Sequence, residues 1–235
     1  MKIFLDISHG GTDPGAVSIV KESQYALSYG LELGHVLKEL GFEVMYSRTT
    51  DVFVSLSERC NMANVWGADY FISIHFNAGG GIGIETFALS AGGKGEWLAS
   101  AVQTALITST GSRDRGIKFA NFQVLRNTKM PAILIEGGFV DNPIDAKNIQ
   151  TEDYKRKFIQ GATKGICAYT GVVWKDTYAL VVAPVIALPT PSPDITDPNV
   201  NFLVWVRTSK AKQAKEQINA LGYACEQFPI EIRKE

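Results

Sequence analysis

Short apolar runs alternate along the chain with segments in which apolar residues recur at helical spacing. The apolar runs predict buried strands over residues 2–7, 42–47, 70–75, 83–89, 123–125 and 132–136. The segments with helical spacing predict helices over residues 23–40, 55–66, 95–108, 142–150 and 151–169. Strand–helix alternation of this kind predicts an α/β fold with a mostly parallel, twisted sheet and helices on both faces.

The chain changes character after Gly171. Prolines separated by Ser, Thr and Asp predict a stiff, solvated linker, and they are Pro184, Pro189, Pro191, Pro193 and Pro198. Beyond them the pattern is that of a strand, a Lys-rich helix and a further extended stretch. We therefore expect three parts. A large domain covers residues 1–172, a linker that is proline-rich from 188 covers 173–200, and a small α+β module covers 201–235.

Composition narrows the class of protein. The chain has 235 residues and a formal net charge of −1, which argues against a dedicated nucleic-acid binder, since such proteins need clustered Lys and Arg. Three cysteines, Cys60, Cys167 and Cys225, are too far apart for a disulfide framework or a paired zinc site, and we expect small buried thiols. No apolar run reaches the roughly 18 residues of a membrane helix, so no membrane insertion is expected.

The amino-terminal pattern bears on where the protein is made. The first residues pass directly into a strand pattern and lack the basic start, apolar stretch and cleavage site of a signal peptide. We therefore expect synthesis in the cytoplasm without a signal peptide, so any action outside the cell would follow release by other means.

Four polar residues fall where a parallel sheet gathers function, at the carboxyl ends of its strands. His9, His75 and Glu136 each follow an apolar run, and Glu22 begins the first helix. Two imidazoles and a carboxylate are the ligands of catalytic zinc sites, and a further carboxylate can act as general base on water. Singly, each residue has an ordinary structural explanation, such as a hydrogen-bonded histidine or a helix-start glutamate. Their convergence on one edge favours a metal site.

A set of short motifs carries a resemblance to a known family. These motifs occupy residues 6–16, 21–22, 47–51, 56–64, 73–78, 83–87, 115–118 and 131–142. Together they make the chain, over about residues 1–171, resemble the zinc-dependent N-acetylmuramoyl-L-alanine amidases of the type-3 amidase family, found in bacterial autolysins and phage endolysins. One departure is Ser8, where the family often has Gly or Ala, and it adds only a small hydroxyl beside the first histidine.

The resemblance implies a set of roles. His9, Glu22 and His75 would bind one zinc ion, and Glu136 would be the catalytic carboxylate. The reaction implied is hydrolysis of the amide between the lactyl group of N-acetylmuramic acid and the L-alanine of the stem peptide. The partner implied is bacterial peptidoglycan.

Other matched residues have weaker cases. Glu85 is a candidate for orienting a ligand or binding substrate, and equally for a solvated strand residue. Asn77 is a candidate for shaping the loop after His75. Asn142 is a candidate for contacting glycan or peptide, although an Asn before Pro143 is also a natural helix cap.

Arg48 and Arg59 are expected to be structural ion-pair partners rather than catalytic groups.

The last segment also carries a resemblance. Residues 210–223 resemble half of a SPOR-type peptidoglycan-binding domain, which predicts cell-wall targeting, with a stabilising appendage as the alternative. So short a module is too small to fold alone, and self-association would complete its sheet.

Several functions fit these features. The expected one is a phage endolysin that lyses the host wall after release. Alternatives are a sporulation or mother-cell autolysin with the same activity, a zinc peptidase or deacetylase acting on another amide, and a non-catalytic peptidoglycan-binding protein. The last would lack a ligand or the base, and the sequence has all four residues.

Overall fold

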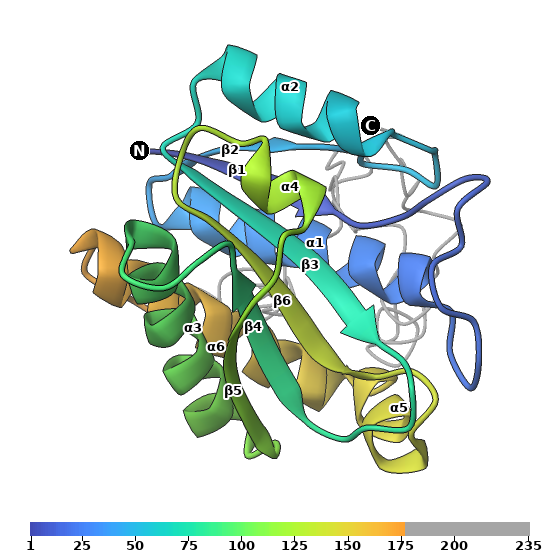
Figure 1. The fold of residues 1–235 in the computed structure, drawn as a ribbon. Helices are drawn as coiled ribbons and strands as arrows, with labels where there is room; N and C mark the ends of the chain where they lie inside the picture. Colours follow the sequence, from blue (N-terminus) through green and yellow to red (C-terminus); the bar gives the residue numbers. More distant parts are fainter. Residues whose placement is uncertain (177–235) are drawn as a thin grey trace, which may run out of the picture. The chain divides into compact units, whose positions relative to one another are not determined.

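The computed structural model describes residues 1–176, which form six strands and six helices (Figure 1). The strands are β1 (Lys2–Ile7), β2 (Glu43–Tyr46), β3 (Tyr70–Asn77), β4 (Ile84–Ala88), β5 (Asp114–Phe119) and β6 (Ala132–Phe139). The helices are α1 (Glu22–Glu39), α2 (Leu56–Trp66), α3 (Lys94–Thr110), α4 (Gln123–Arg126), α5 (Pro143–Ile149) and α6 (Glu152–Thr170). Nearly all of the predicted linker, the whole predicted module and its SPOR-like helix lie outside the described residues.

The strands form one six-stranded sheet in the order β2-β1-β3-β6-β4-β5. Strands β1, β2, β3 and β6 are parallel, whereas β4 pairs antiparallel with β6 and β5 pairs parallel with β4. The α/β class and the mostly parallel sheet are thus confirmed, with the correction that β4 and β5 run the other way. The amino-terminal ends of β4 and β5 therefore lie beside the carboxyl end of β6.

One predicted element was wrong, and one strand was not predicted. Residues 123–125, expected as a strand, form helix α4, because a short apolar run does not distinguish a strand from one buried helical turn. Strand β5 was not predicted, since its sequence, DRGIKF, is charged and only half-buried at the edge of the sheet. Strands β3 and β6 also extend past their expected ends, so His75 and Glu136 lie within them.

Helices cover both faces of the sheet, as predicted. Helices α1, α3 and α6 pack together on one face, whereas α2 and α4 pack on the other (Figure 1). Two glycines of α6 allow its close approach to α3, because an added Cβ at Gly165 would lie 2.4 Å from the Cα of Val102 and one at Gly161 would lie 2.8 Å from the Cα of Leu106.

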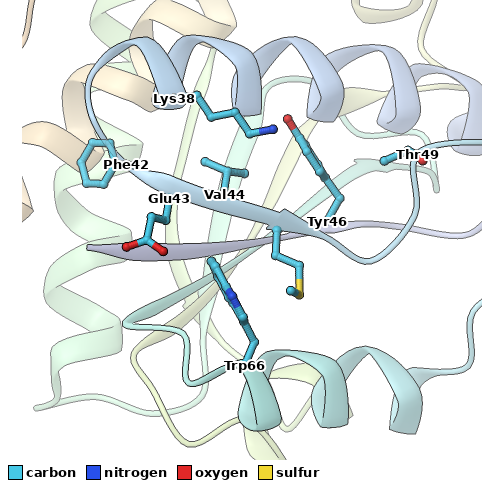
Figure 2. Close-up of a pocket in the computed structure, with 8 residues that line it drawn as sticks. Lys38, Phe42, Glu43, Val44, Tyr46, Thr49 and Trp66 are labelled. Carbon is cyan, nitrogen blue, oxygen red and sulfur yellow. The ribbon is translucent and has the colours of Figure 1, made fainter. Parts of the chain in front are cut away.

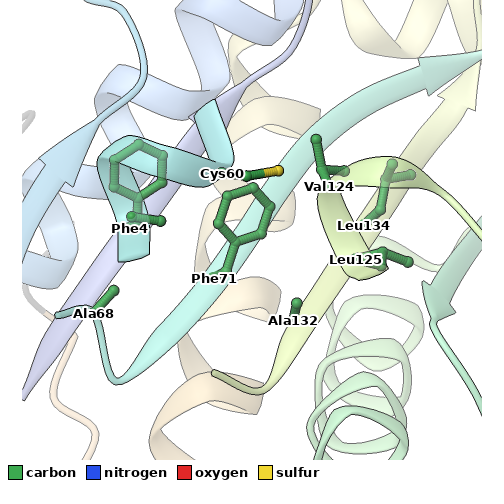
Figure 3. Packing of buried hydrophobic residues seen from close by; sticks show 9 residues of the cluster. Phe4, Cys60, Ala68, Phe71, Val124, Leu125, Ala132 and Leu134 are labelled. Atoms are coloured by element: carbon green, nitrogen blue, oxygen red, sulfur yellow. The ribbon is translucent and has the colours of Figure 1, made fainter. Parts of the chain in front are cut away.

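Part of the hydrophobic core lies between the sheet and helices α2 and α4 (Figure 3). The rings of Phe4 on β1 and Phe71 on β3 stack there with centroids 5.6 Å apart. Cys60 is buried in this cluster and Cys167 in α6, and both are free thiols as expected, while Cys225 lies outside the described residues. Among the described helices, none combines the length and the apolar character that crossing a membrane requires.

Candidate functional site

Three residues predicted as metal ligands converge at one end of the sheet. His9 follows β1, Glu22 is the first residue of α1, and His75 lies on β3. The carboxylate oxygen Oε1 of Glu22 lies 3.1 Å from Nε2 of His9 and 3.0 Å from Nδ1 of His75. One ligand atom from each of the three residues lies within 4.8 Å of the others. The structure therefore brings together residues far apart in the sequence.

The backbone at His9 is held in an uncommon conformation. Its φ is +55°, in the left-handed region that side chains other than glycine rarely adopt. Arg59 Nη2 donates to the carbonyl oxygen of His9 at 2.9 Å, and Arg48 Nη2 donates to that of Ser8 at 2.7 Å. These bonds from buried guanidinium groups fix the turn that aims the imidazole, and such strain gathers at functional sites.

The two arginines are therefore structural, as predicted, but they differ. Arg59 pairs with the carboxylate of Asp6 at 2.7 Å, and both side chains are almost fully buried. Arg48 instead donates to carbonyl oxygens, including those of Ile7 and Ser23. The expected ion pair is thus confirmed for Arg59, whereas the hydrogen bonds of Arg48 go to the backbone.

Hydrogen bonds to neighbouring groups orient the side chains of His9 and Glu22 towards one another. His9 Nδ1 lies 2.9 Å from Asp13 Oδ2, which directs Nε2 towards Glu22. Glu22 accepts from the backbone N–H of Ala16 through Oε2, at 2.9 Å. Burial opposes the charge of Glu22, but hydrogen bonds from His75 and His9 outweigh it and hold the pKa of this carboxyl well below its usual range. Asp13 was not predicted to act here, although its place four residues after His9 was the available signal.

These residues fit a zinc ion. One ligand atom from each of the two imidazoles and the carboxylate lies within 4.8 Å of the others, so a single ion could be held by all three residues. Two imidazoles with one carboxylate also match the ligands of catalytic zinc sites, which leave a fourth position open. The partner of the His9 ring, Asp13, is the kind of carboxylate that such ligands use to fix their tautomer.

Glu136 stands beside this cluster. It pairs with His75 in the register of β6 and β3, so both side chains lie on the same face of the sheet. Burial raises the pKa of Glu136 to about 7, and its oxygen Oε2 is buried with no hydrogen-bond partner among the described residues. A carboxyl with a pKa near neutrality and an unpaired oxygen can accept and return a proton.

Glu85 is buried on β4 and holds several partners. Its Oε1 accepts from Asn77 Nδ2 at 2.9 Å, and its Oε2 lies 2.6 Å from Arg115 Nε and 2.8 Å from Lys118 Nζ. Asn77 thus connects the end of β3 to Glu85. Arg115 and Lys118 were matched in sequence but had no predicted role. Contact of Glu85 or Asn77 with substrate stays a prediction.

Asn142 occupies the N-cap of α5. Its Oδ1 accepts from the backbone N–H of Ile144 at 2.9 Å and of Asp145 at 3.3 Å. The capping alternative is therefore what the geometry shows, and contact with glycan or peptide stays a prediction.

A shallow hollow also lies along the edge strand β2 (Figure 2). Its lining residues are Lys38, Phe42, Glu43, Val44, Met45, Tyr46, Thr49 and Trp66. The ammonium group of Lys38 lies over the Tyr46 ring, 4.9 Å from its centroid. This lining has one carboxylate and no imidazole, so the hollow lacks the set of ligands found at His9, Glu22 and His75.

Comparison with known proteins gives one consistent result. The model of the family described as N-acetylmuramoyl-L-alanine amidase matches residues 3–168. The sporulation-specific N-acetylmuramoyl-L-alanine amidase of Bacillus subtilis (strain 168) is 40% identical over 170 residues, which are 71% of this chain and 67% of the relative. The amidase CwlM of Bacillus licheniformis is 42% identical over the same shares.

A phage protein and a solved structure match as well. The endolysin of Bacillus phage SPP1 is 35% identical over 173 residues, covering 70% of this chain and 64% of the endolysin. The catalytic domain of CwlV, an N-acetylmuramoyl-L-alanine amidase from Bacillus (Paenibacillus) polymyxa var. colistinus, has a TM-score of 0.70 and 32% identity over 73% of this chain and 99% of that domain.

Proposed function

The chain belongs to the N-acetylmuramoyl-L-alanine amidase family, and from this premise we propose that Glu136 carries the proton in a zinc-dependent hydrolysis whose metal is held by His9, Glu22 and His75. The protein is an N-acetylmuramoyl-L-alanine amidase, a peptidoglycan hydrolase. The bond that we propose it breaks is the amide between the lactyl group of N-acetylmuramic acid and L-alanine.

The residues divide the work between holding a metal and moving a proton. The two histidines and Glu22 would hold zinc, which when bound would supply Lewis acidity to polarise a carbonyl and to lower the pKa of water to about 7. Glu136 takes a proton from the attacking water as the carbon–oxygen bond forms. It then returns the proton to the nitrogen as the carbon–nitrogen bond breaks, so that a carboxylic acid and an amine result.

The observation that supports Glu136 in this role is its placement. It lies opposite His75 across neighbouring strands, with a buried oxygen that has no partner among the described residues. Glu85, the neighbouring carboxylate on β4, has both oxygens occupied by Asn77, Arg115 and Lys118. Glu136 is therefore the better base of the two.

We further propose a bacterial autolysin active in sporulation or mother-cell lysis rather than the phage endolysin expected from the sequence. The support is that the relative named as sporulation-specific is 40% identical, against 35% for the phage endolysin. This role predicts that the protein accumulates during spore formation. A gene located among phage lysis genes would contradict it.

The experiment that tests the activity is digestion of purified peptidoglycan with and without a chelator, followed by identification of the new ends. We expect free lactyl carboxyl groups and free L-alanine amino termini, and we expect the chelator to abolish both. New ends elsewhere would instead support the zinc peptidase or deacetylase. Wall binding without new ends would support a non-catalytic binding protein.

A further inference from the structure

A row of charged side chains crosses the sheet, starting from His75 of the proposed metal site. His75 on β3 faces Glu136 on β6, and Glu136 faces Glu85 on β4. Directly paired residues present their side chains on the same face, so these three lie side by side. Arg115 and Lys118 on β5 extend the row, because both contact the carboxylate of Glu85. The row therefore joins the catalytic carboxylate to a pair of cations.

The cation pair carries more charge than Glu85 neutralises. Burial disfavours the charged form of Glu85, but hydrogen bonds from Lys118 and Arg115 prevail and lower its pKa, so it holds one negative charge. Two cations face this single anion, and a surplus positive charge results. The side chains of Arg115 and Lys118 are 27% and 39% exposed, whereas that of Glu85 is 5% exposed. The surplus positive charge is therefore on the two side chains that solvent or a ligand can reach.

Arg115 is held in place by contacts that leave its two terminal nitrogens available to donate to a ligand. Its Nε donates to Glu85, and its guanidinium lies over the Phe139 ring, 4.8 Å from the centroid. Within the part of the chain that the structure describes, its two terminal nitrogens make no hydrogen bond. Asn77 fixes Glu85 through the other oxygen. Such a fixed guanidinium, beside an ammonium, suits a carboxylate ligand.

We propose that Arg115 and Lys118 bind the first free carboxylate of the stem peptide beyond L-alanine, and thereby select substrates in which this group is not amidated. The inference rests on the proposed function, since it takes Glu136 as the group that protonates the leaving nitrogen. That nitrogen must lie within reach of Glu136, and we infer that the peptide attached to it continues across the sheet. The direction away from His75 leads to Glu85 and the cations.

The dimensions agree with a short peptide. Strands lie about 4.8 Å apart, so β5 is roughly 10 Å from β6. Two extended residues span about 7 Å, and a hydrogen bond from a carboxylate to a cation adds about 2.8 Å. In a stem peptide whose second residue is a glutamate linked through its γ-carboxyl, the α-carboxyl is the group that reaches this place.

The alternative is that the two cations only stabilise buried Glu85. That structural role predicts equal loss of activity on every substrate when Lys118 is replaced. The proposed role predicts a loss that depends on the charge of the substrate. The two explanations therefore differ in a measurement of specificity.

The test uses the zinc-loaded full-length protein and two soluble muramoyl peptides that differ only in a carboxylate or a carboxamide at the second stem residue. Hydrogen bonds to charged groups correspond to about a 10- to 100-fold effect, so we expect wild-type kcat/KM to be at least about tenfold higher on the carboxylate. Lys118→Met should remove most of this preference, mainly through KM, and Lys118→Arg should retain it. The matched control is Arg126→Gln, an exposed arginine of α4 that bonds to Asn121, which should leave the preference unchanged.

Each outcome separates the two proposals. Equal kcat/KM on the two peptides would overturn the role of the cation pair and leave the amidase assignment intact. A Lys118→Met variant that loses the same factor on both peptides would also overturn it. Cleavage of neither peptide by the wild type would count against the proposed function itself.

Discussion

Glu136 on β6 lies directly opposite His75 on β3, in the parallel register that joins the two central strands. This pairing places a carboxyl with a buried oxygen beside an imidazole of the proposed metal site, without making the carboxyl part of the cluster that His9, Glu22 and His75 form. Binding of the metal and transfer of the proton should therefore be separable by mutation.

Replacing Glu136 with Gln should greatly reduce turnover and leave zinc binding unchanged. We expect activity on peptidoglycan to fall about 10²- to 10⁴-fold, because the general base is lost, while zinc content and thermal stability stay at the wild-type level. The release of L-alanine amino termini measures the activity, and atomic emission measures the zinc content. Glu43→Gln, an exposed carboxylate of β2, is the matched control. Wild-type turnover in Glu136→Gln would move the catalytic role elsewhere, with Glu85 the next candidate.

Replacing His75 or His9 with Ala should lose zinc, because two remaining protein ligands rarely hold it. Both variants should stay folded by circular dichroism and lose activity together with the metal. The matched control is His35→Gln on α1, which lies outside the three-residue cluster and should bind zinc normally. Full zinc occupancy in both alanine variants would refute the ligand assignment.

Asp13 offers a test of the surroundings of the metal. Its carboxylate accepts from His9 at 2.9 Å, and removal of such a partner typically weakens metal binding about 10- to 100-fold. Asp13→Asn should therefore raise the Kd for zinc by that factor while leaving the fold unchanged, as titration with a competing chelator would measure. An unchanged Kd would mean that Asp13 does not orient the ring.

The sequence alone indicated the class of fold and the clustering of His9, Glu22, His75 and Glu136, because apolar runs mark central strands and parallel strands gather their ends. It did not indicate the reversal of β4 and β5. In a wholly parallel sheet, the start of β4 would lie at the opposite edge, and Glu85 could not face Glu136. Strand direction depends on tertiary packing, which the local sequence pattern does not contain. A half-buried edge strand such as β5 also lacks the apolar pattern by which strands are predicted.

The buried pair of Arg59 and Asp6 should carry much of the stability of the site. Arg59→Met would leave the Asp6 carboxylate buried without its partner, which typically costs about 3–5 kcal/mol of unfolding free energy. It would also remove the bond to the carbonyl of His9. Denaturant unfolding of the zinc-loaded protein measures the loss. Arg156→Met breaks an exposed pair with Asp153 and should cost at most about 1 kcal/mol, and equal losses in the two variants would contradict the prediction.

The end of the catalytic domain can be tested by truncation. Helix α6 ends at Thr170, and Gly171 closes it with a φ of +75°. The next residues still contact this helix, since Lys164 Nζ lies 4.6 Å from the centre of the Trp174 ring and Gln160 Nε2 lies 3.3 Å from the Asp176 carboxylate. A chain that stops after Asp176 should therefore fold, and it retains Glu136 and the three proposed metal ligands.

The same truncation tests the expectation that the carboxyl-terminal segment targets the cell wall. The truncated enzyme should cleave small soluble muropeptides at the wild-type rate, because the site lies wholly upstream. It should pellet poorly with intact walls, since a linked binding module raises avidity by roughly 10²- to 10⁴-fold. Cosedimentation with purified walls at several enzyme concentrations measures this loss. Unchanged wall binding would reduce the segment to an appendage. An insoluble product would mean that the catalytic domain extends beyond Asp176, so that the boundary expected at residue 172 is too early.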